Sequence, residues 1–377
     1  MPKPIYLDHA AATPLDPAVL QAMQPFWQEQ FYNPSATYLP AQTVKQALEQ
    51  ARADIAKVLG ARGPEIIFTA GGTESCNLAV HGIMQQYPGA NVVVSGVEHE
   101  AVLAPAQQYA HQLAPVGPDG IVVLEKLQKA INDQTVLVSV MYANNEVGSL
   151  QPITKIGQLI KRLNLERQQK NNPLPLYFHT DACQAAAYLD LNVARLGVDL
   201  MTLNGGKIYG PKQSGILYVK GGLKLQPQIN GGGQEYNLRS GTENVAACVG
   251  FAKALQLVQT KRHQEGKRLQ TIQQDFLQQL PEVWRLNGSN SQRLPNNLHI
   301  TFPGADNERL LIQLEMAGIL AAAGSACSAQ KGVPSHVLKA MGLSDQDAQA
   351  SLRFTMGKTT TGVELTKLLK TLVKLLS

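Results

Sequence analysis

The apolar residues of the first 255 positions follow two alternating patterns. Short runs rich in Val, Ile and Leu predict buried strands, and stretches with apolar residues at helical spacing separate most of them. The strand candidates are Glu65–Thr69, Asn91–Ser95, Thr135–Met141, Leu176–His179, Asp199–Leu203 and Gly215–Val219. The helix candidates are Pro17–Gln30, which Asp16 could cap, Ala41–Leu59, Thr73–Met84 and Ile153–Gln168. This alternation indicates a mainly parallel sheet buried on both faces, although the last two strands lie close in sequence and need not be parallel.

The pattern changes after about residue 255. A polar stretch rich in Gln and Lys, 256–279, predicts one or two long solvent-facing helices. An α+β pattern follows, with strand candidates at Asn297–Phe302, Gly318–Ala322 and Ser351–Thr355. The final stretch, 363–376, has a Leu face and a Lys face, and we expect it to close the core of this second part. A helix lying on a membrane surface is the alternative for this stretch.

Length and composition support two folded domains. The chain has 377 residues, 44% of them hydrophobic and 16% charged, which excludes a disordered or collagen-like protein. We expect an α/β protein with a large domain over 15–255 and a small domain formed by 1–14 and 256–377. The net charge of +5 is spread along the chain, so a dedicated nucleic-acid binder is not expected.

Targeting and redox signals are also weak. No apolar run reaches the roughly 20 residues of a membrane span, and the first residues lack the apolar core of a signal peptide. The four cysteines, Cys76, Cys183, Cys248 and Cys327, stand far apart without metal-ligand spacing. Neither a disulfide framework nor a structural metal site is therefore expected, and we predict a soluble cytoplasmic enzyme.

A turn of small residues follows the first strand candidate and opens a helix at Thr73. Backbone N–H groups and the helix dipole at such a junction can bind a phosphate, and Gly71 and Gly72 would let the backbone approach the anion. The pattern matches neither the dinucleotide fingerprint nor the Walker A motif. An ordinary glycine turn with a threonine cap is the alternative for this segment.

Asp181 and Lys207 each follow a predicted strand. An acid at the end of a buried strand lies at the ligand-binding edge of an open sheet and could keep a ring nitrogen protonated, although Asp181 could instead only cap a helix. A lysine confined in a glycine-rich loop can form a Schiff base, whereas a lysine on a surface loop is only a charge. A phosphate cradle, a strand-end Asp and a loop Lys, in that order, are what a pyridoxal-phosphate enzyme needs.

The chain carries a longer ordered series of motifs. They are Tyr6-Leu-Asp-His-Ala-Ala-Ala-Thr-Pro, Gly-Gly-Thr73-Glu-Ser, Glu98-His99-Glu, Asn144-Asn145-Glu-Val-Gly, His-Thr-Asp181-Ala-Cys-Gln184, Lys207-Ile-Tyr-Gly-Pro-Lys, Gly231-Gly-Gly-Gln-Glu, Arg239-Ser-Gly-Thr242, Gly324-Ser-Ala-Cys327-Ser and Leu-Arg353-Phe-Thr. The series closely resembles the cysteine desulfurases, within the class V aminotransferase family of fold-type-I pyridoxal-phosphate enzymes. The resemblance covers nearly the whole chain, to about Gly357, and the cysteine motif resembles the subgroup with the longer catalytic loop.

The resemblance implies a role for each motif around pyridoxal phosphate. Lys207 would carry the cofactor covalently, Asp181 would pair with its ring nitrogen, and Gln184 would contact its phenolic oxygen. His99 would stack on the ring and help to move protons; a residue that merely starts a helix is the alternative. Gly72, Thr73 and Asn204 would bind the phosphate, together with Thr242 from the neighbouring subunit of a homodimer.

The substrate implied by the resemblance is L-cysteine. Asn145, which also contacts the cofactor, and Arg353 would hold the substrate carboxylate. Cys327 would attack the substrate sulfur, which releases alanine and leaves a persulfide on this thiol. Acceptor proteins for iron–sulfur cluster assembly or tRNA thiolation would take the sulfur, and transient contact of Cys327 with an iron–sulfur cluster is the only metal contact implied. The alternatives are a selenocysteine lyase or another carbon–sulfur lyase, and, more remotely, a non-catalytic scaffold subunit.

The chain departs from its relatives at three places. It has Asn204-Gly-Gly206 where most relatives have Ser-Gly-His before the lysine, and we expect Asn204, Thr73, Thr242 and loop amides to suffice for the phosphate. Cys76 replaces a usual Asp, and we expect no catalytic role for it. The sequence stops just after the Leu/Lys helix, where several relatives continue with a segment that docks the scaffold protein.

Overall fold

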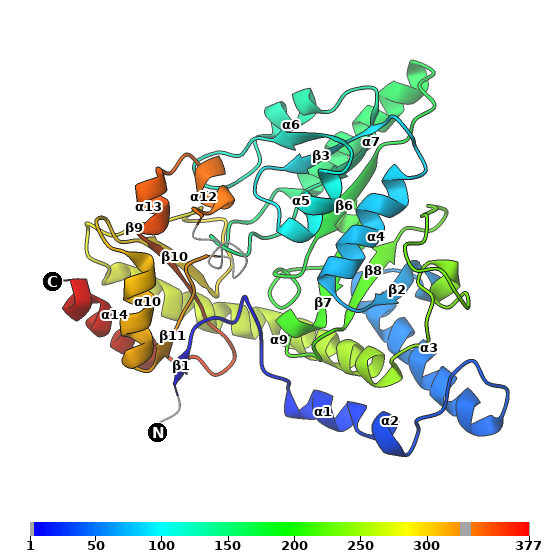
Figure 1. The fold of residues 1–377 in the computed structure, drawn as a ribbon, viewed down its shortest axis with the longest axis horizontal. Coiled ribbons are helices and arrows are strands. Elements are labelled where there is room, and N and C mark those ends of the chain that lie inside the picture. Colours follow the sequence, from blue (N-terminus) through cyan, green and yellow to red (C-terminus); the bar gives the residue numbers. More distant parts are fainter. Residues whose placement is uncertain (1–3, 325–332, 377) are drawn as a thin grey trace.

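The computed structural model describes residues 4–324 and 333–376. Its largest sheet has seven strands in the order β2-β8-β7-β6-β5-β3-β4 (Figure 1). The strands are β2 (Ile66–Thr69), β3 (Asn91–Ser95), β4 (Ala110–Ala114), β5 (Thr135–Ser139), β6 (Tyr177–Asp181), β7 (Leu200–Asn204) and β8 (Gly215–Val219). Strands β3 to β7 are parallel to their neighbours in this group, and β8 runs antiparallel to both β7 and β2. The mainly parallel sheet predicted from the sequence is therefore confirmed, with a reversal at the last strand.

The edge strand β4 is absent from the sequence prediction for a physical reason. Four of its five residues are exposed, so it carries no apolar run. In β3, β5 and β8, by contrast, every residue is buried, which is why their Val, Ile and Leu runs predicted them. The hydrophobic pattern of a sequence thus predicts strands that are buried on both faces, and it misses an exposed strand at the edge of a sheet.

Helices cover both faces of the large sheet. On one face α3 (Leu39–Leu59), α7 (Ile153–Gln169) and α9 (Val245–Gln278) share a core with Val93, and on the other α4 (Gly72–Met84) and α5 (Glu100–Ala106) share a core with Val92 and Val94. Consecutive valines of one strand thus enter opposite cores, as the pleat requires. The remaining helices of this part are α1 (Pro17–Met23), α2 (Pro25–Gln28), α6 (Leu124–Ala130) and α8 (Val193–Leu196).

The expected helix Pro17–Gln30 is wrong in its length. Asp16 does cap it, accepting a hydrogen bond from the Ala18 amide at 2.9 Å. The helix ends at Met23, because Pro25 lacks an N–H to continue the ladder and starts a second short helix.

Two smaller sheets lie beside the large one (Figure 1). One is antiparallel, in the order β12-β10-β9, and the other is a parallel pair of β1 and β11. Their elements are β1 (Ile5–Tyr6), β9 (Arg285–Leu286), β10 (Asn297–Thr301), β11 (Ile319–Leu320), β12 (Ser351–Thr355), α10 (Asn307–Met316), α12 (His336–Ala340), α13 (Asp345–Gln349) and α14 (Gly362–Leu376). The Leu face of α14 is buried in this core, which confirms a helix that closes it.

Helix α9 joins the two parts. The sequence predicts one or two helices from about residue 256, whereas a single helix begins at Val245. Its first half, with Phe251 and Leu255, belongs to the core of the large sheet, and its second half, with Leu269 and Phe276, belongs to the core of the smaller sheets. No helix in residues 4–324 and 333–376 combines the length and apolarity needed to cross a membrane.

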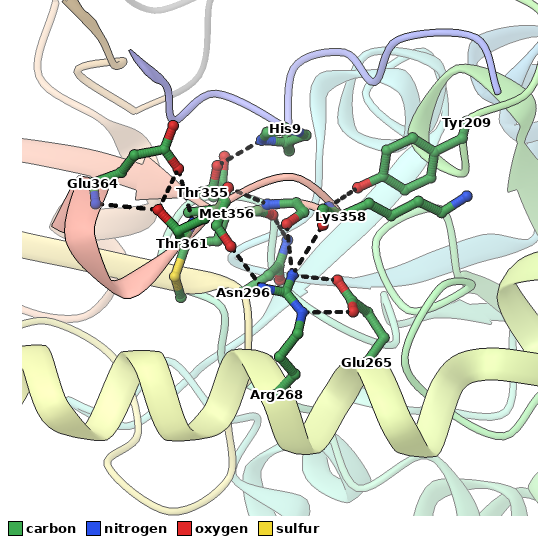
Figure 2. Close-up of polar contacts among 12 residues, drawn as sticks. His9, Tyr209, Glu265, Arg268, Asn296, Thr355, Met356, Lys358, Thr361 and Glu364 are labelled. Carbon is green, nitrogen blue, oxygen red and sulfur yellow. Dashed lines mark hydrogen bonds and ion pairs between the residues drawn. The ribbon is translucent and has the colours of Figure 1, made fainter. Parts of the chain in front are cut away.

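Arg268, in the second half of α9, holds the turn that follows β12. Its Nη1 donates to the carbonyl of Thr360 at 2.6 Å, and its Nη2 donates to the carbonyl of Gly357 at 2.9 Å (Figure 2). Glu265, one turn earlier, accepts hydrogen bonds from Nε and Nη2 of the same guanidinium. The turn is therefore fixed to the long helix through backbone carbonyls.

Lys358, in the same turn, reaches the large sheet's part of the chain. Its amide donates to the hydroxyl of Tyr209 at 2.8 Å, and its ammonium lies 4.1 Å from the centre of that ring. The ammonium also pairs with Asp16 at 2.7 Å. Tyr209 lies two residues after Lys207, so the lysine loop and the end of β12 are tied together.

Candidate active site

One cavity of about 260 Å³ lies where β6 and β7 end and α4 begins. It is lined by residues from the large sheet, from the N-terminal segment and from β12, including Met141 and Ala143 after β5. Among the lining residues are these predicted site residues: Gly72, Thr73, His99, Asn145, Asp181, Gln184, Asn204, Lys207 and Arg353. The structure thus brings together predicted site residues that lie up to 281 positions apart, from Gly72 to Arg353.

The amino end of α4 forms a bare backbone surface on this cavity. Gly71, just before the helix, has φ of 143°, a conformation that favours glycine, and Gly72 is the first helical residue. A Cβ on Gly72 would lie 3.0 Å from the Cys183 sulfur and 3.4 Å from Nδ2 of Asn204. Glycine here therefore lets the turn pack against Cys183 and Asn204. The first N–H groups of a helix lack partners within it. This is the geometry of an anion cradle.

Lys207 ends a short 3₁₀ turn, η2 (Gly205–Lys207), directly after β7. Its ammonium donates to the carbonyls of Ala10 at 2.8 Å and Ala11 at 2.6 Å. Burial lowers the pKa of this amino group below the ordinary lysine value. A larger fraction of Lys207 is therefore the neutral, nucleophilic amine at a given pH than for a lysine in water.

Asp181 is the last residue of β6 and is buried. Its Oδ1 accepts a hydrogen bond from the Cys183 amide at 2.9 Å, which points the carboxylate along the strand end. Cys76, on α4, lies behind it with its sulfur 3.9 Å from Oδ2. Burial raises the pKa of the Cys76 thiol well above its ordinary value, so this thiol stays protonated and un-nucleophilic.

His99 serves as the N-cap of α5 and also lines the cavity. Its Nδ1 accepts a hydrogen bond from the Ala101 amide at 3.0 Å, so in the neutral ring the proton is on Nε2. His99 can therefore both start the helix and take part in proton transfer, because the cap uses Nδ1 and leaves Nε2 for the second role.

Arg353 is in the middle of β12, and its side chain is almost completely buried. Nη2 pairs with Asp8 at 2.7 Å, and Nη1 donates to the Asn145 carbonyl at 3.0 Å. Nε has no hydrogen-bond partner within residues 4–324 and 333–376. A buried guanidinium that retains a free donor beside a cavity is suited to a carboxylate.

Gln184 and Asn204 complete the wall. Gln184 donates from Nε2 to the Ala10 carbonyl at 3.0 Å. Asn204 accepts at Oδ1 from the Gly206 amide at 3.0 Å, which leaves its NH₂ group on the side of Gly72.

Two predicted residues are not placed in this cavity. Thr242 is exposed, in the loop before α9, and does not line it. Cys327 lies outside the residues that the structure describes, 4–324 and 333–376.

Sequence reasoning missed several contributors to the site. Asp8, the ion-pair partner of Arg353, lies in a motif that carried the resemblance, but nothing local assigns it a partner 345 residues away. Cys183 lines the cavity inside the Asp181 motif, and burial raises the pKa of its thiol well above the ordinary value. The carbonyls of Ala10 and Ala11 are backbone atoms, which leave no signal in a sequence.

The groups on the cavity fit pyridoxal phosphate. The cradle at Gly72 suits a phosphate, the Asp181 carboxylate suits a protonated ring nitrogen, and the Lys207 amine suits an aldehyde. A Cβ on Gly72 would crowd Cys183 and Asn204 of the same wall, so glycine lets the first turn of the helix lie directly against the cavity.

Comparison with known proteins identifies the class. The "Aminotransferase class-V" family matches residues 5–368, and the chain belongs to this family. A protein named cysteine desulfurase IscS, from Dictyoglomus turgidum, is 39% identical over 387 residues, which cover 100% of this chain and 95% of that protein. Within the family, the chain groups with the cysteine desulfurases.

Solved structures agree with this grouping. A structure titled "NIFS-LIKE PROTEIN" matches with a TM-score of 0.91 and 30% identity, over 99% of each chain. A structure titled "SspA in complex with cysteine" matches with a TM-score of 0.80 and 32% identity, over 93% of this chain and 98% of that one. The expected fold-type-I architecture and the expected family are both confirmed.

Proposed function

We propose that this chain uses pyridoxal phosphate to remove sulfur from L-cysteine, with Cys327 as the acceptor thiol. The observation that carries the proposal is a single cavity bordered by the Lys207 amine, the Asp181 carboxylate, the amino end of α4 and the Arg353 guanidinium. When bound, pyridoxal phosphate supplies an electron sink that stabilises negative charge at the substrate α-carbon. Side chains of the protein would bind the cofactor and the substrate, orient them and transfer protons.

Each side chain has a task that its position supports. The α4 cradle, with Thr73 and Asn204, would hold the phosphate, Gln184 would contact the phenolic oxygen, and Asp181 would keep the ring nitrogen protonated. Lys207 would hold the aldehyde carbon and, once the substrate amine has replaced it, move a proton at the α-carbon. Its lowered pKa suits that exchange, because the released amine can accept a proton.

Substrate orientation falls to Arg353 and Asn145. Arg353 is already held by Asp8 and by the Asn145 carbonyl, so a carboxylate would meet a guanidinium that has little freedom left to lose. His99 would stack on the ring and offer its Nε2 proton. The buried surroundings strengthen these charge interactions relative to water.

The sulfur step requires Cys327 as a thiolate. It attacks the substrate sulfur, so that a sulfur–sulfur bond forms, the carbon–sulfur bond breaks and its electron pair stays with the substrate carbon. Protonation of that carbon leads to L-alanine, and Cys327 is left as a persulfide. Acceptor proteins for iron–sulfur cluster assembly or tRNA thiolation would then take the terminal sulfur.

The decisive experiment is mass spectrometry of the holoenzyme after incubation with L-cysteine. We expect Cys327 to gain one sulfur atom and one alanine to appear per persulfide formed. Cys327→Ser should lose both products, whereas Cys248→Ala, which changes a buried thiol on α9, should keep them. Alanine release by Cys327→Ser would instead indicate a lyase that does not use this thiol. Absence of both products from the loaded wild type would indicate a non-catalytic subunit.

We further propose a cytoplasmic homodimer in which Thr242 contacts the phosphate held by the neighbouring subunit. Its exposed place outside its own chain's cavity supports a role toward a second copy. Large apolar side chains gather on the exposed surface of residues 20–39, which supports an interface there. These residues are Leu20, Trp27, Phe31, Tyr38 and Leu39.

A further inference from the structure

The amino end of α4 carries a negative charge where an anion is expected. Glu74 is the third residue of the helix, and its side chain turns back so that Oε2 accepts a hydrogen bond from the Ala70 amide at 3.0 Å. Its carboxylate therefore shares the helix end with the cradle formed by Gly71, Gly72 and Thr73. A carboxylate in this place repels a phosphate and also competes with it for the positive end of the helix dipole.

Arg239 lies against this carboxylate. Its Nε donates to Oε1 of Glu74 at 2.9 Å, and both side chains are about one quarter exposed. Arg239 reaches Glu74 from the loop 229–241, which is remote in sequence from α4. The pair makes the helix end neutral before any ligand arrives.

The loop that carries Arg239 is closed on itself. Ser240 donates its amide to the Ile229 carbonyl at 3.0 Å, and the Gly241 amide donates to the side chain of Gln234 at 2.9 Å. Glu235, Tyr236 and Asn237 all have positive φ, between 47° and 65°. Three consecutive non-glycine residues in this region are strained, and such strain persists only where other contacts hold the backbone in place.

Glu235 supplies those contacts. It forms a bidentate, buried ion pair with Arg52 of α3, with both nitrogen–oxygen distances at 2.8 Å. Its Oε2 also accepts from the Phe68 amide at 2.7 Å, and Arg52 donates to the Ile66 carbonyl at 2.7 Å. The ion pair thus occupies the open edge of β2, the strand that leads directly into the cradle.

We propose that Arg239 is a charge-balancing residue of the anion cradle, held in place by the Arg52–Glu235 pair. By neutralising Glu74 it lets the amino end of α4 accept a dianionic phosphate group. Arg239 acts through Glu74 and is a positioning residue. The inference rests on the proposed function, since it concerns the phosphate end of the proposed cofactor.

Charge balance predicts a specific order of affinities. Arg239→Gln leaves Glu74 as a net negative charge beside the phosphate, and we expect about tenfold weaker binding of pyridoxal phosphate to the apoprotein. Glu74→Gln leaves a net positive charge, so binding should be as tight as in the wild type or tighter. The double variant is neutral again and should return to within about twofold of the wild type.

The measurement is an equilibrium titration of each apoprotein, followed by intrinsic fluorescence, with pyridoxal phosphate and with unphosphorylated pyridoxal. Arg239→Gln should weaken only the phosphorylated ligand, and the loss should shrink at 1 M salt, where the Debye length is about 3 Å. Arg195→Gln is the matched control, because it removes one exposed arginine from an ion pair with Asp190 elsewhere on the surface.

Three results would overturn the inference: unchanged binding by Arg239→Gln, equal weakening of both ligands, or a double variant no tighter than Arg239→Gln. The last two would mean that the pair only holds the loop. Failure of the wild-type apoprotein to bind pyridoxal phosphate at all would overturn the proposed function instead. Inorganic phosphate then serves as the probe, and the same order of affinities among the variants would uphold the charge balance.

Discussion

Glu98 is a carboxyl group with no exposed surface, next to His99 in the sequence. One oxygen accepts hydrogen bonds from the Ser95 hydroxyl and the Met141 amide, and the other has no partner within residues 4–324 and 333–376. Burial raises its pKa to about 8, with Asp181 adding to the shift. Glu98 therefore keeps its proton at neutral pH. The buried residues around the cavity thus carry one negative charge fewer than the number of their carboxyl groups suggests.

This proton makes stability depend on pH. The ordinary pKa of a glutamate is 4.5, so the unfolded chain loses the proton at lower pH than the folded chain does. Stability should therefore fall as pH rises from about 5 to 8 and level off above that. Glu98→Gln keeps both accepted hydrogen bonds without the titration, and it should gain up to about 3 kcal/mol on the wild type between pH 5 and 8.

Urea unfolding at several pH values measures this difference. Glu100→Gln is the control, since Glu100 is exposed two residues away. Parallel curves of unfolding free energy against pH for the wild type and Glu98→Gln would contradict the argument.

The residue-level prediction of the site is strongest where chemistry needs a particular side chain. Lys207, Asp181 and Gly72 were assigned from their residue types and their places after predicted strands, and the structure puts them on one cavity. Their roles stay predictions, as do those of Thr242 and Cys327. Nothing local could predict the Asp8–Arg353 pair, because it depends on how the segment after β1 meets β12 in space.

At the scale of elements, the start of β8 shows how closely strand and cradle are packed. A Cβ on Gly215 would lie 2.6 Å from Cα of Gly71 and 2.9 Å from the Leu203 carbonyl. These are backbone atoms, so no side-chain rotation can relieve the overlap. A glycine at this position is what lets the cradle lie against β8.

Gly215→Ala should therefore cost about 1–3 kcal/mol of unfolding free energy and weaken retention of pyridoxal phosphate. Gly206→Ala is the matched control, because its nearest neighbour would be Oδ1 of Asn204 at an ordinary 3.4 Å. Denaturant unfolding and cofactor dialysis measure the two effects. Equal stability of the two variants would show that Gly71 can move aside at little cost.

The space around Gly206 bears on the difference in sequence at this position, where the resemblance leads us to expect a histidine. A Cβ at this position would make only ordinary contacts, 3.4 Å from Oδ1 of Asn204 and 3.9 Å from Cγ of Lys212. The glycine is therefore not required by packing, and the NH₂ group of Asn204 remains as the neighbouring donor.

Element prediction succeeded where burial is uniform. The strands β3 and β8 have the predicted bounds, because every residue in them faces a core. The two-residue strands β1 and β9 were missed, since so short a pairing has no period to detect. The split after Met23 was missed although Pro25 signals it, because the apolar spacing continues across the proline.

At the scale of the whole molecule, α9 links two cores that the sequence treats as separate domains. The expected boundary at residue 255 stays a prediction, because the helix runs unbroken through it from Val245 to Gln278. Through Arg268 and the turn after β12, the helix also holds the strand that carries Arg353. The strand with Arg353 and, through Lys358 and Tyr209, the turn that carries Lys207 are thus both connected to this helix.

The proposed homodimer gives a prediction for the assembled molecule. Trp27, in α2, and Phe31, three residues after α2, are 57% and 67% exposed. Helix α2 lies at the lower side of the view in Figure 1. Replacing both by Glu should bury charge in the interface and convert the dimer to monomer in analytical ultracentrifugation. Met316→Glu, at an 85% exposed site on α10, is the control and should leave the dimer intact. A monomeric wild type, or a dimeric double variant, would contradict this interface.

The parallel pairing of Ile5 with Ile319 has a consequence for the order in which the ribosome makes this protein. The backbone that receives the Lys207 ammonium, at Ala10 and Ala11, is translated first, yet its neighbours in β11 and β12 are translated more than 300 codons later. The cavity wall that includes Arg353 of β12 is therefore incomplete until translation is nearly finished. The site proposed for the cofactor is therefore complete only after nearly the whole chain has been made.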